Sequence, residues 1–240
     1  MIDPLHQFEI KKFFDFNLIG LKIPFTNSAL FMVLAVVSIF TLFMFGIRNR
    51  LMIPSRLQMA IESLYNFVKT LVQDNIGPEG MPYISLVLSV FLFVLFGNIL
   101  GMVPYAFTFT SHIIVTFTLA LFVFAIVIGV GLKHHGFHFL SIFMPEGAPK
   151  IMAPILIPIE VLSFFSRPIS LSVRLFANMM AGHTILKVFA GFTVALGIFG
   201  IAPLLVNAAL MSLEFLVAFL QAYVFTILTC LYLKDAIHLH

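Results

Sequence analysis

Long apolar runs separated by short polar stretches dominate this chain. The runs cover residues 29–47, 83–103, 113–132, 151–189 and 203–234. Each reaches about the 20 apolar residues that a helix needs to cross a bilayer. Because apolar and polar residues do not alternate within them, these runs do not fit the strands of a membrane β-barrel. The pattern predicts an all-α integral membrane protein, a single membrane domain over 1–240 with five membrane-crossing helices.

A different pattern occupies residues 54–76. It begins with Pro54, a residue type favoured at the first position of a helix. The apolar residues that fall on one face at helical spacing are Leu57, Ile61, Leu64, Val68 and Leu71. Polar and charged residues occupy the other positions. The segment therefore predicts an amphipathic helix that lies on the membrane surface.

The last two runs, 151–189 and 203–234, predict a long helical hairpin. The first of them is longer than a perpendicular crossing requires, so it must tilt or bend. Pro154, Pro158 and Pro168 are the available bend points. We therefore expect a long tilted hairpin at the end of the chain.

Basic residues near the ends of the runs predict the orientation in the membrane. Those that follow the first, third and fifth runs are Arg48, Arg50, Arg56, Lys69, Lys133, Lys150 and Lys234. The loops 104–112 and 190–202 contain no lysine or arginine. Only the arm 1–27, which we expect at the membrane interface, carries basic residues on the other side. With five crossings, the N-terminus is predicted outside and the C-terminus inside.

Composition supports this membrane assignment and excludes other classes. The chain is 61% apolar and 10% charged, against about 45–50% and about 25% in soluble domains. The net charge is only +3 with no basic tract, so a nucleic-acid partner is not indicated. The single cysteine, Cys230, excludes a disulfide framework within the chain. The first 20 residues fit neither a signal nor a transit peptide, so the first run predicts a retained span.

Polar residues recur at intervals of seven in the last two runs. They are Glu160, Arg167 and Arg174 in 151–189, and Asn207, Glu214 and Gln221 in 203–234. Residues seven apart lie 20° short of two full turns, so each set shares one helix face. Ionisable groups inside a membrane are costly and mark ion or proton paths. The competing interpretation is a set of buried packing groups or an internal salt bridge.

Small residues surround the central arginine on its face. Ser170 lies four positions before Arg174, and Ala177 and Ala181 lie three and seven positions after it. Small residues allow another helix to approach closely in lipid. The spacing thus predicts that Arg174 faces a partner helix, either of this chain or of another one, with Asn178 placed one turn on to orient it.

Several segments resemble subunit a of F-type ATP synthases. They are PISLSVRLFANMMAGH (168–183), LEFLVAFLQAYVFTILTCLYL (213–233), GNILGMVPY (97–105) and SHIIVT (111–116). The resemblance covers nearly the whole chain. It implies one spanning helix, a surface helix, two further spans and a long tilted hairpin against a rotating c-ring. This fold agrees with the layout that the apolar pattern predicts.

The resemblance also implies roles for individual residues. Arg174 matches the essential arginine of the family, which faces the c-ring. His183 and Glu214 match a coupled pair that lines the half-channel from the outside. In many bacterial relatives the acid and the histidine exchange places, which implies that the two side chains meet. Glu160 matches an acidic residue of the half-channel toward the inside.

Further implications concern polar supports and partners. Asn178 and Gln221 match polar residues near the essential arginine. The implied function is a proton-translocating stator subunit that couples proton flow to rotation and ATP synthesis, without a cofactor. Its implied partners are c-ring subunits, peripheral-stalk b-type subunits and the lipid bilayer. A bacterial plasma membrane and a mitochondrial inner membrane both fit, and the residues alone leave proton and sodium transport open.

Two other function classes fit the sequence less well. A stand-alone transporter usually contains an internal repeat, and the chain shows none. A membrane enzyme would need a reactive motif, and no G-x-S-x-G, H-E-x-x-H or phosphate-binding glycine loop occurs. His134, His135 and His138 have spacings that suit a metal, but they lie in a polar loop beside a lysine, and we expect no metal there. We also expect no direct ATP binding.

Overall fold

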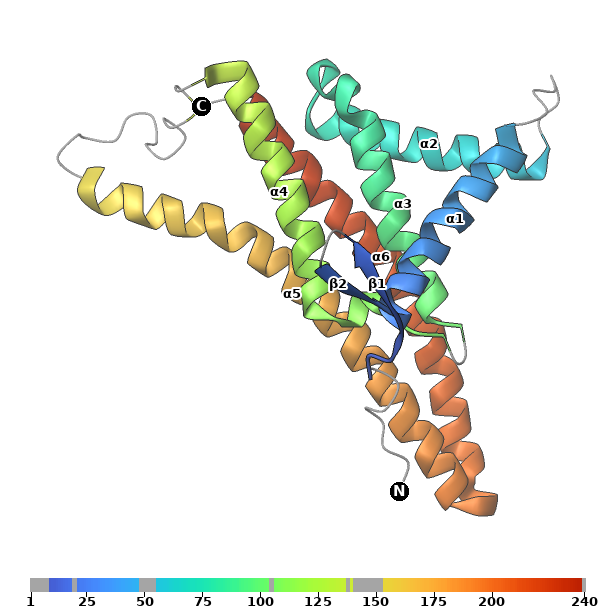
Figure 1. The fold of residues 1–240 in the computed structure, drawn as a ribbon. Helices are drawn as coiled ribbons and strands as arrows, with labels where there is room; N and C mark the ends of the chain where they lie inside the picture. Colours follow the sequence, from blue (N-terminus) through green and yellow to red (C-terminus); the bar gives the residue numbers. More distant parts are fainter. Residues whose placement is uncertain are drawn as a thin grey trace.

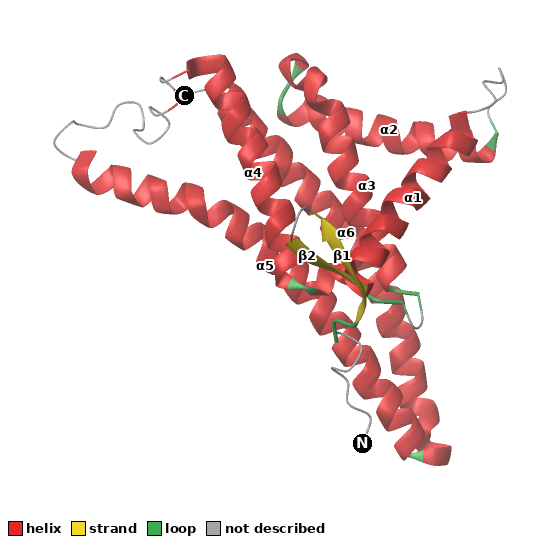
Figure 2. Ribbon diagram, in the orientation of Figure 1, coloured by secondary structure: helices red, strands yellow, loops and turns green. Residues whose placement is uncertain are grey.

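Helices form almost all of the regular structure. The computed structural model describes residues 9–18, 21–47, 55–103, 106–136, 139 and 153–238. The helices are α1 (Asn27–Ile47), α2 (Arg56–Asn75), α3 (Ile84–Gly101), α4 (Ile113–His135), α5 (Ala153–Ala195) and α6 (Ile201–Ile237) (Figures 1 and 2). The described residues contain five helices long and apolar enough to cross a membrane. The predicted all-α membrane fold is thus confirmed. His138, Lys150, Arg48 and Arg50 lie outside the described residues.

The N-terminal arm contains a hairpin that the apolar pattern did not predict. Strands β1 (Lys12–Leu18) and β2 (Leu21–Thr26) pair antiparallel. The sequence alternates Phe14, Asp15, Phe16 and Asn17, which is the period of a strand. β2 leads directly into α1, where Asn27 Oδ1 accepts a hydrogen bond from the Ser28 amide at 2.9 Å.

Helix α2 runs across the ends of α1 and α3 (Figure 1). Its first turn is capped by Ser55, whose Oγ accepts from the Gln58 amide at 3.3 Å. Ile61, Val68 and Leu71 are buried on its inner face, whereas Leu57 in the first turn is exposed. The predicted amphipathic helix is therefore present, with Leu57 as an exception to its buried face, and its place on the membrane surface stays a prediction.

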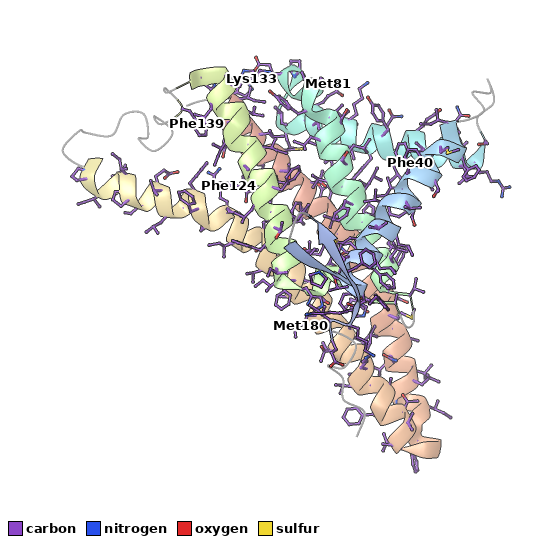
Figure 3. All side chains as sticks on the ribbon, viewed as in Figure 1. Phe40, Met81, Phe124, Lys133, Phe139 and Met180 are labelled. Atoms are coloured by element: carbon purple, nitrogen blue, oxygen red, sulfur yellow. The ribbon has the colours of Figure 1, made fainter. Side chains whose placement is uncertain are left out.

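The core lies where α6 packs against α3, α4 and α5. Its fully buried side chains include Val87, Phe91, Val123, Val127 and Phe225. By contrast, large apolar side chains are exposed along α1, α5 and α6, and side chains project outward along the whole length of these helices (Figure 3). Such an apolar surface suits lipid and not water.

Helices α5 and α6 form the expected long hairpin. The 3-10 helix Gly197–Gly200 joins them, and Gly197 has a φ of 53°, a left-handed conformation that glycine adopts without a Cβ clash. The first part of α5 diverges from α6, and its later part runs beside α6 (Figure 1). Pro158 and Pro168 lie within α5, where a proline removes a backbone hydrogen bond and bends the helix.

Two glycines of α3 let the chain fold back against that helix. A Cβ on Gly97 would lie 2.5 Å from the ring of Phe109, and a Cβ on Gly101 would lie 2.6 Å from Thr108 Cγ2. Real side chains do not approach so closely, so glycine is required at both positions. This contact fixes the segment 106–112, which enters the candidate site.

We expect Gly97→Ala to destabilise the fold. The added methyl group must displace Phe109, a fully buried ring, and overpacking of this kind costs about 1–3 kcal/mol. Gly129→Ala is the matched control, because a Cβ there meets no atom within 4 Å. Thermal unfolding of the detergent-purified protein tests this: Gly97→Ala should lower the Tm, Gly129→Ala should leave it unchanged or raise it, and equal Tm values would contradict the packing argument.

Candidate functional site

The hairpin brings His183 of α5 and Glu214 of α6 together. His183 Nδ1 lies 3.5 Å from Glu214 Oε1, and both side chains are buried. Gly182 makes this approach possible, because a Cβ there would lie 2.6 Å from Glu214 Oε1. Lys187, one turn further along α5, interacts electrostatically with His183. The contact between histidine and acid that the family resemblance implies is therefore present in this chain.

Thr108 fixes the far side of the histidine ring. Its hydroxyl donates to the Gly101 carbonyl at 3.1 Å, and the same Oγ1 lies 3.0 Å from His183 Nε2. A threonine hydroxyl has one proton, so Oγ1 accepts from a protonated Nε2. In the neutral ring Nδ1 then carries no proton and faces Glu214. The pair can therefore hold one proton between Nδ1 and Oε1 while Nε2 stays anchored.

Further buried polar residues lie near His183 and Glu214. Asn98 on α3 is fully buried and donates to the Ala218 carbonyl of α6 at 3.2 Å. The buried atoms nearby that have no protein hydrogen-bond partner are Asn98 Oδ1, Thr110 Oγ1, His112 Nε2 and both carboxylate oxygens of Glu214. Burial lowers the pKa of His112, so this ring is neutral at neutral pH. Asn98, the segment 108–112, His183 and Glu214 together form the outer polar cluster.

Arg174 lies on the opposite side of α5 from His183. Its side chain is exposed, and so are Ser170, Ala177 and Ala181 on the same face. A shallow groove of about 450 Å³ continues this face toward Met180 and Thr184 (Met180 is labelled in Figure 3). Within the described residues no carboxylate forms an ion pair with Arg174. The face that the small residues marked for a partner helix is therefore left uncovered by the part of the chain that the structure describes.

The other site residues predicted from the sequence lie along the same two helices. Glu160 and Asn178 of α5 are half-buried, and Gln221 of α6 is buried. Among the described residues, no hydrogen bond joins Arg174 to Asn178 or Gln221. Their assigned role as supports of the arginine thus stays a prediction.

Arg167 has an internal partner that the sequence analysis did not identify. Arg167 Nη1 lies 2.7 Å from Asp235 Oδ2 near the end of α6. Its guanidinium carbon also lies 5.5 Å from the ring centre of Phe164 and 5.2 Å from that of Tyr232. Arg167 and Asp235 form an ion pair that the two rings flank. We call these four residues together the inner ion pair. The internal salt bridge considered for the polar stripes is thus realised at Arg167.

The histidines at the end of α4 make hydrogen bonds within the chain. His134 Nε2 lies 3.1 Å from Tyr83 Oη, and His135 Nε2 lies 2.8 Å from the Ile237 carbonyl. These contacts tie α4 to the start of α3 and to the end of α6.

Sequence reasoning missed Thr108, Asn98 and Asp235. Asn98 did carry a signal, since it is a lone amide inside the apolar run 83–103. Thr108 and Asp235 carried little, because a threonine in a loop and an acid at a helix end are ordinary solvated residues.

The family model and the similar proteins all indicate the same protein family. The family model described as ATP synthase A chain matches residues 29–234. The ATP synthase subunit a of Rhodospirillum rubrum is 52% identical over 241 residues and is covered completely, as is this chain. Those of Parvibaculum lavamentivorans (strain DS-1) and Pelagibacter ubique (strain HTCC1062) are each 50% identical, with 99% of this chain covered in both cases and 94% and 98% of the relatives.

Thr108→Val should release the anchored tautomer of His183. The variant keeps the side-chain shape but removes the acceptor 3.0 Å from Nε2, so the proton is no longer held on that nitrogen. Solid-state NMR of ¹⁵N-histidine-labelled protein in lipid reports the tautomer directly. Thr108→Ser retains the hydroxyl and should keep the wild-type spectrum. A His183 signal that is identical in Thr108→Val would contradict the assignment.

Proposed function

Because the chain belongs to the ATP synthase subunit a family, the proton-translocating subunits of the membrane sector, we propose that its α5–α6 hairpin forms two offset half-channels. These half-channels deliver protons to and from the carboxyl groups of a c-ring, and peripheral-stalk b-type subunits hold the chain in place. One observation carries this proposal: Arg174 is exposed on one side of α5, while His183 is buried against Glu214 on the other side. The separation of nine positions between them corresponds to about 13 Å along a helix.

The outer polar cluster is the proposed path from the outside. Buried polar atoms without a protein partner need hydrogen bonds that ordered water can supply. Such atoms occur on Asn98, Thr110, His112 and Glu214, so the cluster favours a hydrated route. The shared proton position between His183 and Glu214 then relays a proton toward the c-ring. The anchored Nε2 keeps Nδ1 directed at the acid during this transfer.

Arg174 acts on the c-ring carboxyl that passes its exposed face. A carboxyl that faces lipid stays protonated, because removal from water disfavours the charged form. Beside a guanidinium the ionised form is favoured instead, so the carboxyl releases its proton there. Arginine suits this position because it does not give up its own proton in proteins. The bare carboxylate must then take a new proton before it re-enters lipid.

The path to the inside runs along the first part of α5. Glu160 is half-buried there, two heptads before Arg174, where α5 diverges from α6 (Figure 1). Most side chains of this first part of α5 are exposed among the described residues, which supports access of water to this helix in the proposed path. Glu160 accepts protons that leave the c-ring and passes them to the inside.

The proposed orientation places the N-terminus outside and the C-terminus inside. Lys133, Lys234 and Arg56 lie at the ends of helices that face the inside in this orientation, as positively charged residues do in most membrane proteins. The outer polar cluster then opens to the opposite side. The membrane is a bacterial plasma membrane or the inner membrane of mitochondria.

Arg174→Ala should abolish proton-driven ATP synthesis while the complex still assembles. The variant removes the charge that releases the rotor proton, but it removes no contact that holds the described helices together. ATP synthesis in membrane vesicles, with quantification of the assembled complex, measures the effect. Arg56→Ala, which removes an exposed cation from α2, should synthesise ATP normally. Normal synthesis by an assembled Arg174→Ala complex would refute the role of Arg174.

Glu214→Gln should lower the synthesis rate and change its dependence on pH. The amide keeps the size of the side chain but cannot exchange a proton with His183 across the 3.5 Å contact. The test is the rate of ATP synthesis as a function of the pH on the outer side. Glu62→Gln on α2, where Glu62 is exposed, serves as the control with an unchanged profile. If Glu214→Gln retains the wild-type profile, Glu214 does not belong to the proton path.

A further inference from the structure

The inner ion pair joins the two hairpin helices close to the rotor-facing arginine. Arg167 precedes Arg174 by seven residues, which places it about 10 Å away along α5 and on nearly the same face. Tyr232 of α6 interacts electrostatically with both arginines. The two cations therefore share one environment but differ in their partners, because among the described residues Asp235 forms an ion pair with Arg167 and not with Arg174.

Several contacts hold Arg167 in this arrangement. Its guanidinium lies over the rings of Phe164 and Tyr232, and a cation above an aromatic face is stabilised by the ring electrons. The Phe164 ring is in turn packed 4.8 Å from Phe124 and 6.4 Å from Phe139 (both labelled in Figure 3). With the 2.7 Å ion pair added, Arg167 is oriented toward α6 and away from the open face of α5.

An unneutralised Arg167 would interfere with the proposed proton path. Two unit charges about 10 Å apart at an effective dielectric constant near 20 change an equilibrium on the order of tenfold. A second free cation at this position would repel protons that leave along the first part of α5. It would also compete with Arg174 for the rotor carboxylate.

We propose that Asp235 is a positioning residue that neutralises Arg167, so that of the two arginines of α5 only Arg174 presents an uncompensated charge to the rotor. This inference rests on the proposed function of the hairpin. The ion pair therefore has an electrostatic purpose beyond the mechanical link between α5 and α6. The two partners are consequently unequal: loss of Asp235 exposes a harmful cation, whereas loss of Arg167 leaves an acid at the inner end of α6, where an anion does not repel protons.

A double-mutant cycle distinguishes neutralisation from a mechanical clamp. The variants are Asp235→Asn, Arg167→Gln and the combination of both, with Asp235→Glu as the variant that keeps the charge. ATP synthesis driven by an imposed proton gradient is measured in membrane vesicles and normalised to the amount of assembled complex. We expect Asp235→Asn to lose on the order of tenfold in rate. Arg167→Gln, the double variant and Asp235→Glu should each stay within about twofold of wild type.

Other outcomes overturn the proposal. A mechanical clamp predicts equal losses in Asp235→Asn and Arg167→Gln, with no recovery in the double variant. Wild-type rates throughout would show that Arg167 needs no neutralisation. If Asp235→Asn does not accumulate, the comparison moves to Arg167→Gln and the double variant, and a loss of more than about tenfold in both overturns the proposal.

Arg174→Ala, measured in parallel, separates this inference from the proposed function. Normal synthesis by Arg174→Ala refutes the function itself. An inactive Arg174→Ala together with a fully active Asp235→Asn refutes only the neutralisation.

Discussion

A guanidinium in apolar surroundings needs an anion or an aromatic face to offset the free energy lost when its water is removed, and this requirement organises the hairpin. Arg167 meets it within the chain through Asp235, Phe164 and Tyr232. Arg174 does not, since no carboxylate among the described residues reaches it. Its exposed face of small residues leaves space for an anion of another chain. In the proposed function, that anion is the moving carboxyl group of the rotor, and the need of Arg174 for it couples this subunit to rotation.

His183, on the other side of α5, and Glu214 of α6 are both titratable and both buried. Two buried titratable groups in contact are stable when they share a proton, because neither then carries an unbalanced charge. Gly182 gives Glu214 the space to reach His183, and Thr108 holds the ring in one orientation. Glycines on α3 and α5 therefore determine the geometry of the site as much as the polar residues do.

The apolar pattern predicted the helices because a span of about 20 residues is dictated by bilayer thickness. It did not predict β1 and β2, since their alternation is short and lies in a segment with several charges. Spacing by seven placed Arg167 and Arg174 on one helix face, but this spacing does not identify the residue that pairs with Arg167. That partner, Asp235, lies 68 residues away in sequence.

The outer polar cluster was only partly predictable for the same reason. His183 and Glu214 were assigned through family resemblance, which carries information from many folded chains. Thr108 and Asn98 make their contacts with residues 75 and 120 positions away. No local period records such contacts. The Thr108 contact depends on Gly97 and Gly101, which let the segment 106–112 pack against α3, and the Asn98 contact depends on the packing of α3 against α6.

An apolar layer separates the outer polar cluster from the inner ion pair, and this layer decides which route a proton can take. Leu175 and Met179 of α5 and Ala218, Ala222 and Phe225 of α6 are each no more than 1% exposed. Packed apolar side chains leave no room for water, so water does not pass between these five described side chains. In the proposed function, the remaining route between the two half-channels follows the open face of α5, where the positive charge of Arg174 repels a proton in transit. On that proposal a proton passes only when it is bound to a neutral carboxyl on the rotor, and carriage of that carboxyl through lipid turns proton flow into rotation.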